Sequence, residues 1–252
     1  MAKSHCVGVD VGSRTTKIIV LDDRSITHAE VFDTVPDPLP EIRRRLAPWA
    51  GATIAATGYG RRLLGGEWGA AIVTEIKACA LGAHELFPEC RLVIDIGGQD
   101  AKAIQVRPDG GFEDFELNDR CSAGTGRFLE VMARALGYGL DEFCREAILA
   151  DRPATLNSMC TVFAESEVVS LLAAGGDRRR IALGIYNAIV DRVYPLAARF
   201  DLSGQIVLAG GVVRSRCVVH LLGEKLGRPV TVPPNPQVLS ALGAALTIPE
   251  TH

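Results

Sequence analysis

Residues 10–17 read D-V-G-S-R-T-T-K, and residues 95–102 read D-I-G-G-Q-D-A-K. In both stretches an aspartate ends an apolar run, a turn containing glycine follows, and a lysine comes seven positions after the aspartate. Short apolar runs bounded by turn residues predict strands, so each stretch predicts a strand–turn–strand hairpin. Two matching hairpins in one chain predict a duplicated fold whose two halves face one another.

The segments around the hairpins alternate between strand and helix patterns, which is typical of an α/β fold. We expect strands over residues 6–11, 17–21, 26–32, 52–57, 91–96, 101–106, 112–117 and 205–209. We expect helices over residues 41–49, 75–86, 125–136, 140–149, 162–174, 178–200, 212–226 and 238–246. The first half is then predicted to comprise residues 1–94 with 236–252, and the second half residues 95–235.

The composition is that of an ordinary globular chain. Of its 252 residues, 48% are hydrophobic and 23% are charged, and the net charge is -3 at pH 7. This charge gives no reason to expect nucleic acid or an anionic membrane as a partner, and no apolar stretch approaches the roughly 20 residues of a spanning helix. The first residues lead directly into a strand-like run without a secretion signal. We therefore expect a cytoplasmic protein.

A strand–Asp–x–Gly–strand hairpin suits a nucleoside triphosphate. Glycine lets the backbone approach the phosphates, and backbone N–H groups donate to phosphate oxygens. Asp10 and Asp95, at strand ends, are candidates to hold hydrated Mg²⁺ and to serve catalysis. The alternative is a pair of ordinary turns, with Lys17 and Lys102 on the hairpin surface. The candidate phosphate ligands are Gly12, Ser13, Arg14, Thr15 and Lys17 in the first hairpin and Gly97, Gly98, Gln99, Asp100 and Lys102 in the second.

Two further features extend this candidate site. Gly210 and Gly211 follow a strand and lead into a helix. Alone they are a weak signal, but after two phosphate hairpins they suit a place where adenosine lies flat on the backbone. Glu75 begins a helix after an apolar strand and is a candidate to order the attacking water. The alternative is an ordinary acidic residue in the first turn of a helix.

These three glycine elements, in this order, resemble the superfamily of ATPases that includes actin, the sugar kinases and the heat-shock chaperones. The resemblance extends from about residue 5 to residue 247. It implies two ribonuclease-H-like halves with ATP or ADP in a cleft between them. Arg14 departs from the pattern, because the superfamily often has a small hydroxyl residue there. That departure argues against a role for the Arg14 side chain in nucleotide binding, but not against a role for the backbone of the turn.

The seven cysteines have irregular spacing, which argues against a disulfide framework in a chain without a secretion signal. Cys121 and Cys160 stand in polar loops just before helices, with Ser122 or Thr125 as the cap of the first helix and Thr161 of the second. The positive end of a helix favours a thiolate, and equally an anionic metal–sulfur cluster. The other cysteines lie in apolar patterns typical of buried thiols: Cys6, Cys79, Cys90, Cys144 and Cys217.

Two thiolates are too few for a 4Fe–4S cluster, because four cysteine thiolates usually hold such a cluster. A twofold dimer would supply the other two thiolates from the second subunit.

Five segments resemble the activators of 2-hydroxyacyl-CoA dehydratases and are similar to the ATPase subunits of benzoyl-CoA reductases. They read D-V-G-S (10–13), A-T-G-Y-G-R (56–61), I-D-I-G-G-Q-D-A-K (94–102), N-D-R-C-S-A-G-T-G-R-F-L-E (118–130) and C-T-V-F-A-E-S-E-V (160–168).

This closer resemblance implies a homodimer, or a pair of related subunits, that bridges one 4Fe–4S cluster through Cys121 and Cys160 of each subunit. It also implies ATP hydrolysis coupled to the transfer of a low-potential electron to an acyl-CoA dehydratase or reductase. A ferredoxin or flavodoxin is the expected electron donor. The motifs are similar whichever acyl-CoA is served, so they leave the partner's substrate open.

Two other functions remain compatible with the hairpins. A small-molecule kinase of the same superfamily would need an aspartate as general base and would have no use for Cys121 and Cys160. A nucleotide-gated scaffold would bind ATP without turning it over. Residues 178–180, three consecutive arginines, are interpreted as a solvated face rather than as a docking site for an acidic partner.

Overall fold

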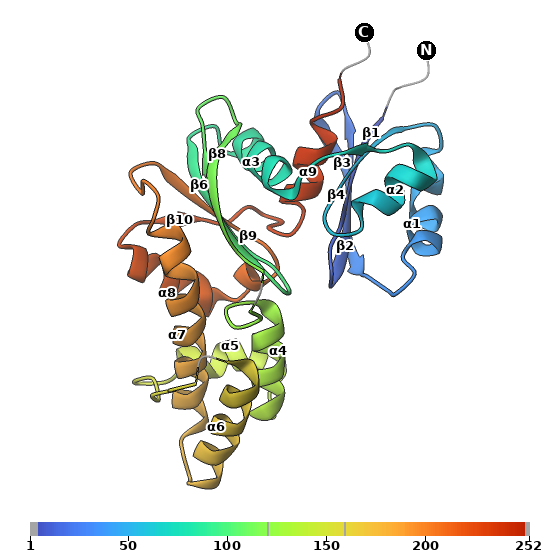
Figure 1. The fold of residues 1–252 in the computed structure, drawn as a ribbon. Coiled ribbons are helices and arrows are strands. Elements are labelled where there is room, and N and C mark those ends of the chain that lie inside the picture. The colour runs from blue at the N-terminus through green and yellow to red at the C-terminus, as the bar shows by residue number, and fades with distance from the viewer. Residues whose placement is uncertain (1–4, 120, 159, 250–252) are drawn as a thin grey trace. The chain divides into compact units, whose positions relative to one another are not determined.

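The computed structural model describes residues 5–119, 121–158 and 160–249 (Figure 1). Its strands form two five-stranded sheets that repeat one topology. The first sheet has the order β3 (Ser25–Asp33), β2 (Thr15–Asp22), β1 (Cys6–Val11), β4 (Thr53–Thr57), β5 (Ala71–Ile72). The second has the order β8 (Phe112–Asn118), β7 (Ala101–Val106), β6 (Cys90–Ile96), β9 (Gln205–Ala209), β10 (Val230–Thr231).

The shared order explains why the sequence pattern restarts. In the first sheet β1, β2 and β3 form an antiparallel meander, and β4 returns parallel to β1. In the second sheet β6, β7 and β8 are neighbours in chain order, and β9 returns beside β6. Each half therefore places its hairpin between its first two strands. The predicted α/β class and the predicted duplication are confirmed.

Along the chain, helices alternate with the strands, and α9 follows the last strand (Figure 1). They are α1 (Leu39–Leu46), η1 (Ala47–Trp49), α2 (Arg61–Trp68), α3 (Glu75–Leu86), α4 (Gly126–Ala135), α5 (Leu140–Ile148), α6 (Thr161–Ala173), α7 (Arg178–Ala197), η2 (Val212–Arg214), α8 (Arg216–Leu226) and α9 (Leu239–Ala245). None of the described helices combines the length and apolar character needed to cross a bilayer.

The structure departs from the predicted elements in a few places. The helix predicted over 212–226 is two pieces, because Ser215 adopts an extended conformation between η2 and α8. Helix α2 was not predicted, since Gly65 and Gly66 lower its helix propensity. It forms because Leu64 is fully buried in the core of the first sheet. The two-residue strands β5 and β10 are too short to leave a pattern.

The chain divides into two compact units. Unit 1 comprises residues 1–93, 104–115 and 234–252, and unit 2 comprises residues 94–103 and 116–233. The C-terminal helix α9 thus belongs with the N-terminal strands. The functional halves predicted from the sequence, with boundaries near residues 94 and 236, stay a prediction.

Close backbone contacts hold α9 in the core of unit 1. A Cβ added to Gly8 of β1 would lie 1.9 Å from a carbonyl oxygen of α9, and one added to Gly82 of α3 would lie 2.1 Å from another. A Cβ added to Gly243 of α9 would lie 1.6 Å from a carbonyl oxygen of α3. Real Cβ atoms do not approach backbone this closely, so the three glycines let β1, α3 and α9 pack main chain against main chain.

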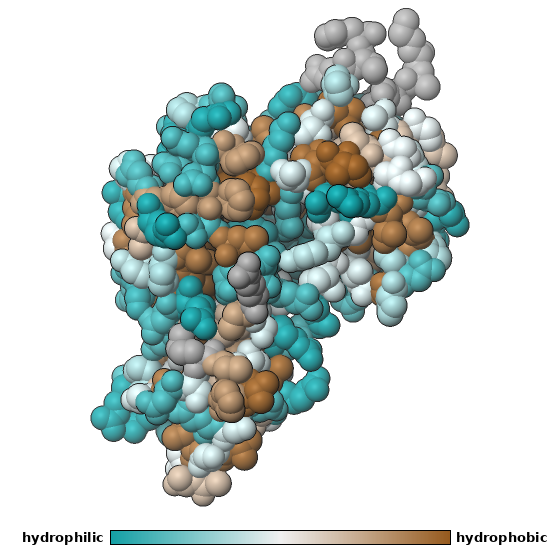
Figure 2. Space-filling view, in the orientation of Figure 1, coloured by the Kyte–Doolittle hydropathy of each residue, from teal (hydrophilic) through white to brown (hydrophobic). Residues whose placement is uncertain are grey.

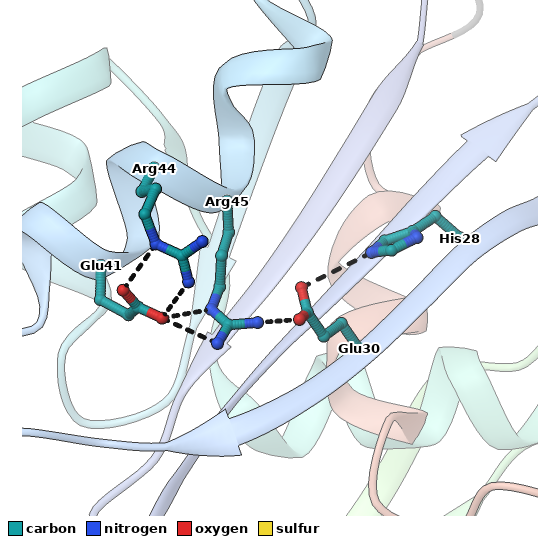
Figure 3. A network of polar contacts seen from close by, with 5 residues as sticks. All are labelled: His28, Glu30, Glu41, Arg44 and Arg45. Carbon is teal, nitrogen blue, oxygen red and sulfur yellow. Dashed lines mark hydrogen bonds and ion pairs between the residues drawn. The ribbon is translucent and has the colours of Figure 1, made fainter.

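A polar network joins α1 to the outer strand β3 (Figure 3). Arg45 lies between Glu41 of its own helix, at 2.7 Å, and Glu30 of β3, which also contacts His28. A hydrogen bond from Arg44 lowers the pKa of Glu41 below its ordinary value. Such exposed pairs contribute little individually. Together they place a helix and charged side chains beside an edge strand, which protects it from pairing with another chain.

We expect Gly243→Ala to lower the free energy of unfolding by about 2–3 kcal/mol, because overpacking forces the backbones of α3 and α9 apart. Gly66→Ala is the matched control, since a Cβ there meets nothing within 4 Å. Because Gly66 is itself exposed, this change should stabilise helix α2 by about 0.5–1 kcal/mol. Urea unfolding of both variants tests this. Equal midpoints for Gly243→Ala and the parent protein would contradict the packing described here.

Candidate functional site

The first hairpin fixes Asp10 through its partner strand. Asp10 of β1 faces Lys17 of β2 in the strand register, and Lys17 Nζ lies 2.9 Å from Asp10 Oδ2. The N–H of Gly12 donates to the carbonyl of Thr15 at 3.1 Å and closes the turn. The tip of the turn exposes Ser13 and Arg14.

The second hairpin repeats this arrangement. Lys102 Nζ lies 3.4 Å from Asp95 Oδ2 and 3.1 Å from Asp100 Oδ2. The N–H of Gly97 donates to the carbonyl of Asp100 at 2.9 Å, and Gln99 is exposed at the tip. Lys102 is only 3% exposed, so the alternative that it lies on the hairpin surface is wrong. The spacing of seven residues noted in the sequence is the spacing of a cross-strand ion pair.

The ion pairs orient the two aspartates. A buried carboxylate loses several kcal/mol of solvation, and an adjacent ammonium group offsets much of that loss. Lys17 holds one oxygen of Asp10, while the other, Oδ1, is buried and has no hydrogen-bond partner among the described residues. A fixed carboxylate oxygen with free acceptor capacity fits hydrated Mg²⁺, which binds through oxygen ligands and retained waters.

A glycine with positive φ lies over each aspartate. Gly58 follows β4 with φ +82, and a Cβ there would lie 2.4 Å from Asp10 Oδ1. Gly210 follows β9 with φ +89, and a Cβ there would lie 2.5 Å from Asp95 Oδ1. Only glycine fits both the conformation and the space. Sequence analysis missed Gly58 as a site residue. The signal available was the glycine that follows the fourth strand in both halves.

The adenosine role predicted for Gly210 and Gly211 stays a prediction, as does the role of Glu75 in ordering water. Gly211 is exposed at the start of η2. Glu75 is half-buried in the first turn of α3, where the hydroxyl of Thr74 accepts the N–H of Lys77 at 3.4 Å.

The two candidate cluster cysteines lie in loops that touch. Cys121 lies ahead of α4 and is half-buried. Cys160 is the residue immediately before α6 and is exposed. The hydroxyls of Ser122 and Thr161, the residues that follow them, share a hydrogen bond of 2.9 Å. Thr125 is the N-cap residue of α4, as one of the two predicted alternatives had it, but its hydroxyl donates to the carbonyl of Ser122 at 2.6 Å and caps no helix N–H. The cap predicted for the second helix is wrong, because Cys160 rather than Thr161 is the N-cap residue of α6.

Polar side chains support both cysteine loops from within unit 2. The carboxylate of Glu167 accepts the backbone N–H groups of Asn157 and Ser158 at 2.8 Å each, just ahead of Cys160 in the chain. Partial burial disfavours the ionised form of Glu167, but these hydrogen bonds outweigh burial and lower its pKa. The amide of Asn118 donates to the carbonyl of Cys121 at 3.2 Å.

The second phosphate hairpin is hydrogen-bonded to the start of α4. The N–H of Gly126 donates to the carbonyl of Gly97, and the N–H of Arg127 donates to the carbonyl of Gly98, each at 2.9 Å. The first N–H groups of a helix have no acceptor within the helix. Here two carbonyls of the hairpin turn accept two of these N–H groups. The turn that is predicted to bind phosphate and the helix that follows Cys121 are thus one connected piece.

Helix α6 is not covered on all its apolar positions by unit 2. It buries Ala164 and Val168, but it also exposes large apolar side chains. Val162 and Phe163 are each 67% exposed, and Val169 is 54% exposed. Apolar side chains gather at the lower end of the view, where α6 lies (Figure 2). These side chains make α6 a candidate interaction surface.

The remaining cysteines follow the predicted pattern only in part. Cys79, Cys90 and Cys217 are buried, whereas Cys6 and Cys144 are half-buried. Burial raises the pKa of Cys217 to about 12, so this thiol is unreactive at neutral pH. Within the described ranges, no group of three or more His, Cys, Asp or Glu side chains is placed to hold a metal ion. Cys121 and Cys160 stay the two predicted cluster ligands of the chain.

The three arginines at the start of α7 face their own unit. Arg179 pairs with Glu146 at 2.6 Å and Arg180 with Asp151 at 2.8 Å. The guanidinium of Arg178 donates to the carbonyl of Leu136 and lies 4.1 Å from the ring centre of Tyr138. The interpretation of residues 178–180 as a solvated face is incomplete, because these side chains attach the start of α7 to its neighbours.

Residues 7–247 match the BadF/BadG/BcrA/BcrD ATPase family. The chain belongs to this family. The activator of lactoyl-CoA dehydratase from Anaerotignum propionicum is 41% identical to it over 252 residues, which cover 96% of each chain.

Solved structures of this ATPase family extend the likeness to the fold. The crystal structure of component A of (R)-2-hydroxyglutaryl-CoA dehydratase from Acidaminococcus fermentans superposes with a TM-score of 0.89, at 37% identity and with 97% of each chain covered. The activator of 2-hydroxyisocaproyl-CoA dehydratase from Clostridium difficile, with bound ADPNP, gives a TM-score of 0.87 at 32% identity, covering 96% of this chain and 93% of that one. The actin-like and sugar-kinase ATPase fold and the family resemblance are confirmed.

Asp10→Asn and Asp95→Asn should each reduce Mg²⁺-dependent ATP hydrolysis by about 10²-fold or more, because each removes a charge fixed beside a phosphate hairpin. Asparagine keeps the shape of the side chain, so circular dichroism should show an intact fold. Asp33→Asn, at the exposed end of β3, is the control and should hydrolyse ATP at the parental rate. Parental rates in both hairpin variants would refute the assignment.

Proposed function

We propose that this protein hydrolyses ATP and thereby delivers a low-potential electron, through one 4Fe–4S cluster shared by two subunits, to a partner acyl-CoA dehydratase or reductase. The observation that carries the proposal is the contact between the Cys121 and Cys160 loops at the starts of two helices. The hydroxyls of Ser122 and Thr161 make this contact through a hydrogen bond. Relatives named as dehydratase activators support the same assignment. We place the protein in the cytoplasm.

The cysteine pair fits half of a cluster site. A 4Fe–4S cluster takes four cysteine thiolates, and each chain contributes Cys121 and Cys160. A twofold axis beside these loops supplies the second pair from an identical subunit. Cys160 is exposed, and the exposed Val162 and Phe163 come two and three residues after it, so the surface around Cys160 is one that a second subunit can cover. When bound, the cluster supplies a one-electron relay.

The hairpins supply the ATPase chemistry. Backbone N–H groups of the two glycine turns bind phosphate oxygens, and Asp10 and Asp95 hold hydrated Mg²⁺. Glu75 orients the attacking water, and adenosine lies on Gly210 and Gly211. Hydrolysis breaks the bond between the β- and γ-phosphates, and the protein contributes mostly positioning and charge stabilisation. The lysine ion pairs serve this by keeping both carboxylates in place before nucleotide arrives.

The coupling route runs within unit 2. A change in the contacts of Gly97 and Gly98 with phosphate shifts their carbonyls, which hold the first N–H groups of α4. Helix α4 follows the Cys121 loop, and that loop is bonded to the start of α6. A change at this turn would therefore reach Cys121 and Cys160, the residues that would hold the cluster. The cluster would pass one electron to the partner enzyme, and a reduced ferredoxin or flavodoxin is the proposed donor.

The iron content of protein purified without oxygen tests the proposal. The parent should be a dimer with about four irons, the content of one cluster. Cys121→Ser and Cys160→Ser should each lose the cluster and its visible absorption, while Cys6→Ser should keep both, because Cys6 is equally half-buried but lies in β1.

Three outcomes would contradict this. Full iron in Cys121→Ser would refute the ligand assignment. A colourless parent that phosphorylates a sugar would favour a kinase instead, and ATP binding without turnover in the presence of reductant and partner would favour a scaffold.

A further inference from the structure

Arg192 of α7 reaches the Cys121 loop from the side. Its guanidinium donates to the sulfur of Cys121 across 3.8 Å. The loop also lies on the stem of the arginine, because a Cβ added to Gly124, whose φ is +91, would lie 2.9 Å from Arg192 Cγ. A larger residue than glycine would move the loop away from the arginine. The local conformation at Gly124 thus brings the cysteine and the guanidinium together.

Arg192 has no acidic partner among the residues that the structure describes, whereas Arg179 and Arg180 of the same helix pair with carboxylates. It is half-buried, and its Nε is buried without a hydrogen-bond partner within the described chain. A cation withdrawn from water without an anion beside it costs free energy. The sulfur of Cys121 is the acceptor that the structure places beside this guanidinium.

We propose that Arg192 is the counter-ion of the Cys121 sulfur and tunes the reduction potential of the bridging cluster. This inference rests on the proposed function. Charge and N–H···S hydrogen bonds around a cluster are among the features that set its reduction potential. Arginine stays protonated throughout the physiological pH range, so its charge is constant. Arg192 acts through Cys121 and is a positioning residue.

The sign of the effect follows from the charges. Reduction adds one electron to the cluster from a one-electron carrier, and no covalent bond forms or breaks. A fixed positive charge beside a ligand sulfur stabilises the more negative, reduced cluster more than the oxidised one. Arg192 therefore raises the reduction potential and eases loading by the donor. In a twofold dimer both copies act on the same cluster.

Redox titration of the iron-loaded dimer tests this. At a fixed solution potential, Arg192→Met should lower the ratio of reduced to oxidised cluster about tenfold, which for one electron is a shift of roughly 59 mV to more negative potential. Arg192→Lys keeps the charge and should shift by less than half as much. Iron content and melting temperature should stay parental in both, which separates tuning from loss of structure.

Arg199→Met is the matched control, because it removes one positive charge from an exposed residue just beyond α7 that pairs with Glu116. Its potential should equal the parental one. If Arg192→Met does not yield a folded dimer, Arg192→Gln takes its place with the same expectation. An unchanged potential in the neutral variant, or an equal shift in Arg192→Lys, overturns the role of Arg192. A parent without iron would instead overturn the proposed function.

Discussion

Two hydrogen bonds connect the turn of the second glycine hairpin with the helix that follows Cys121: those from Gly126 and Arg127 to the carbonyls of Gly97 and Gly98. A helix must find partners for its first N–H groups, and α4 finds two of them in the turn of the second phosphate hairpin. The same turn cannot change its conformation without disturbing the start of α4. Because the Cys121 loop leads into α4, the proposed function uses these two hydrogen bonds as the connection between the hairpin and the thiols.

Comparison of the two halves of the duplicated fold shows which segment of the second half contains α4 and the cysteines. Both sheets have the same strand order, both hairpins carry a lysine–aspartate pair, and both aspartates lie under a glycine of positive φ. The halves differ in what joins their third and fourth strands. In the first half this connection holds α1 and η1, and in the second it holds α4, α5, α6 and α7. Cys121 and Cys160, the two proposed cluster ligands, lie in that larger connection together with Arg192.

Much of this could be predicted from the sequence, and the failures share a cause. The hairpins and most strands follow from local apolar runs and turn residues, which is why the repeat at residues 10–17 and 95–102 predicted the fold. Contacts between distant segments leave no local pattern. The hydrogen bond between Ser122 and Thr161, the position of Gly58 over Asp10, and the contact of Arg192 with Cys121 all depend on tertiary structure. Helix α2 formed against its glycines for the same reason, since tertiary burial of Leu64 outweighs local propensity.

The central claim is that the nucleotide state and the cluster are coupled through unit 2. The most direct measurement is the reduction potential of the cluster in the iron-loaded dimer, with ADP and then with a non-hydrolysable ATP analogue. A ligand shifts an equilibrium only by its preference for one state, and a tenfold preference corresponds to about 1.4 kcal/mol, or roughly 59 mV for one electron. The account predicts that the two potentials differ by an amount of this order. Identical potentials, together with identical rates of iron removal by a chelator, would contradict it.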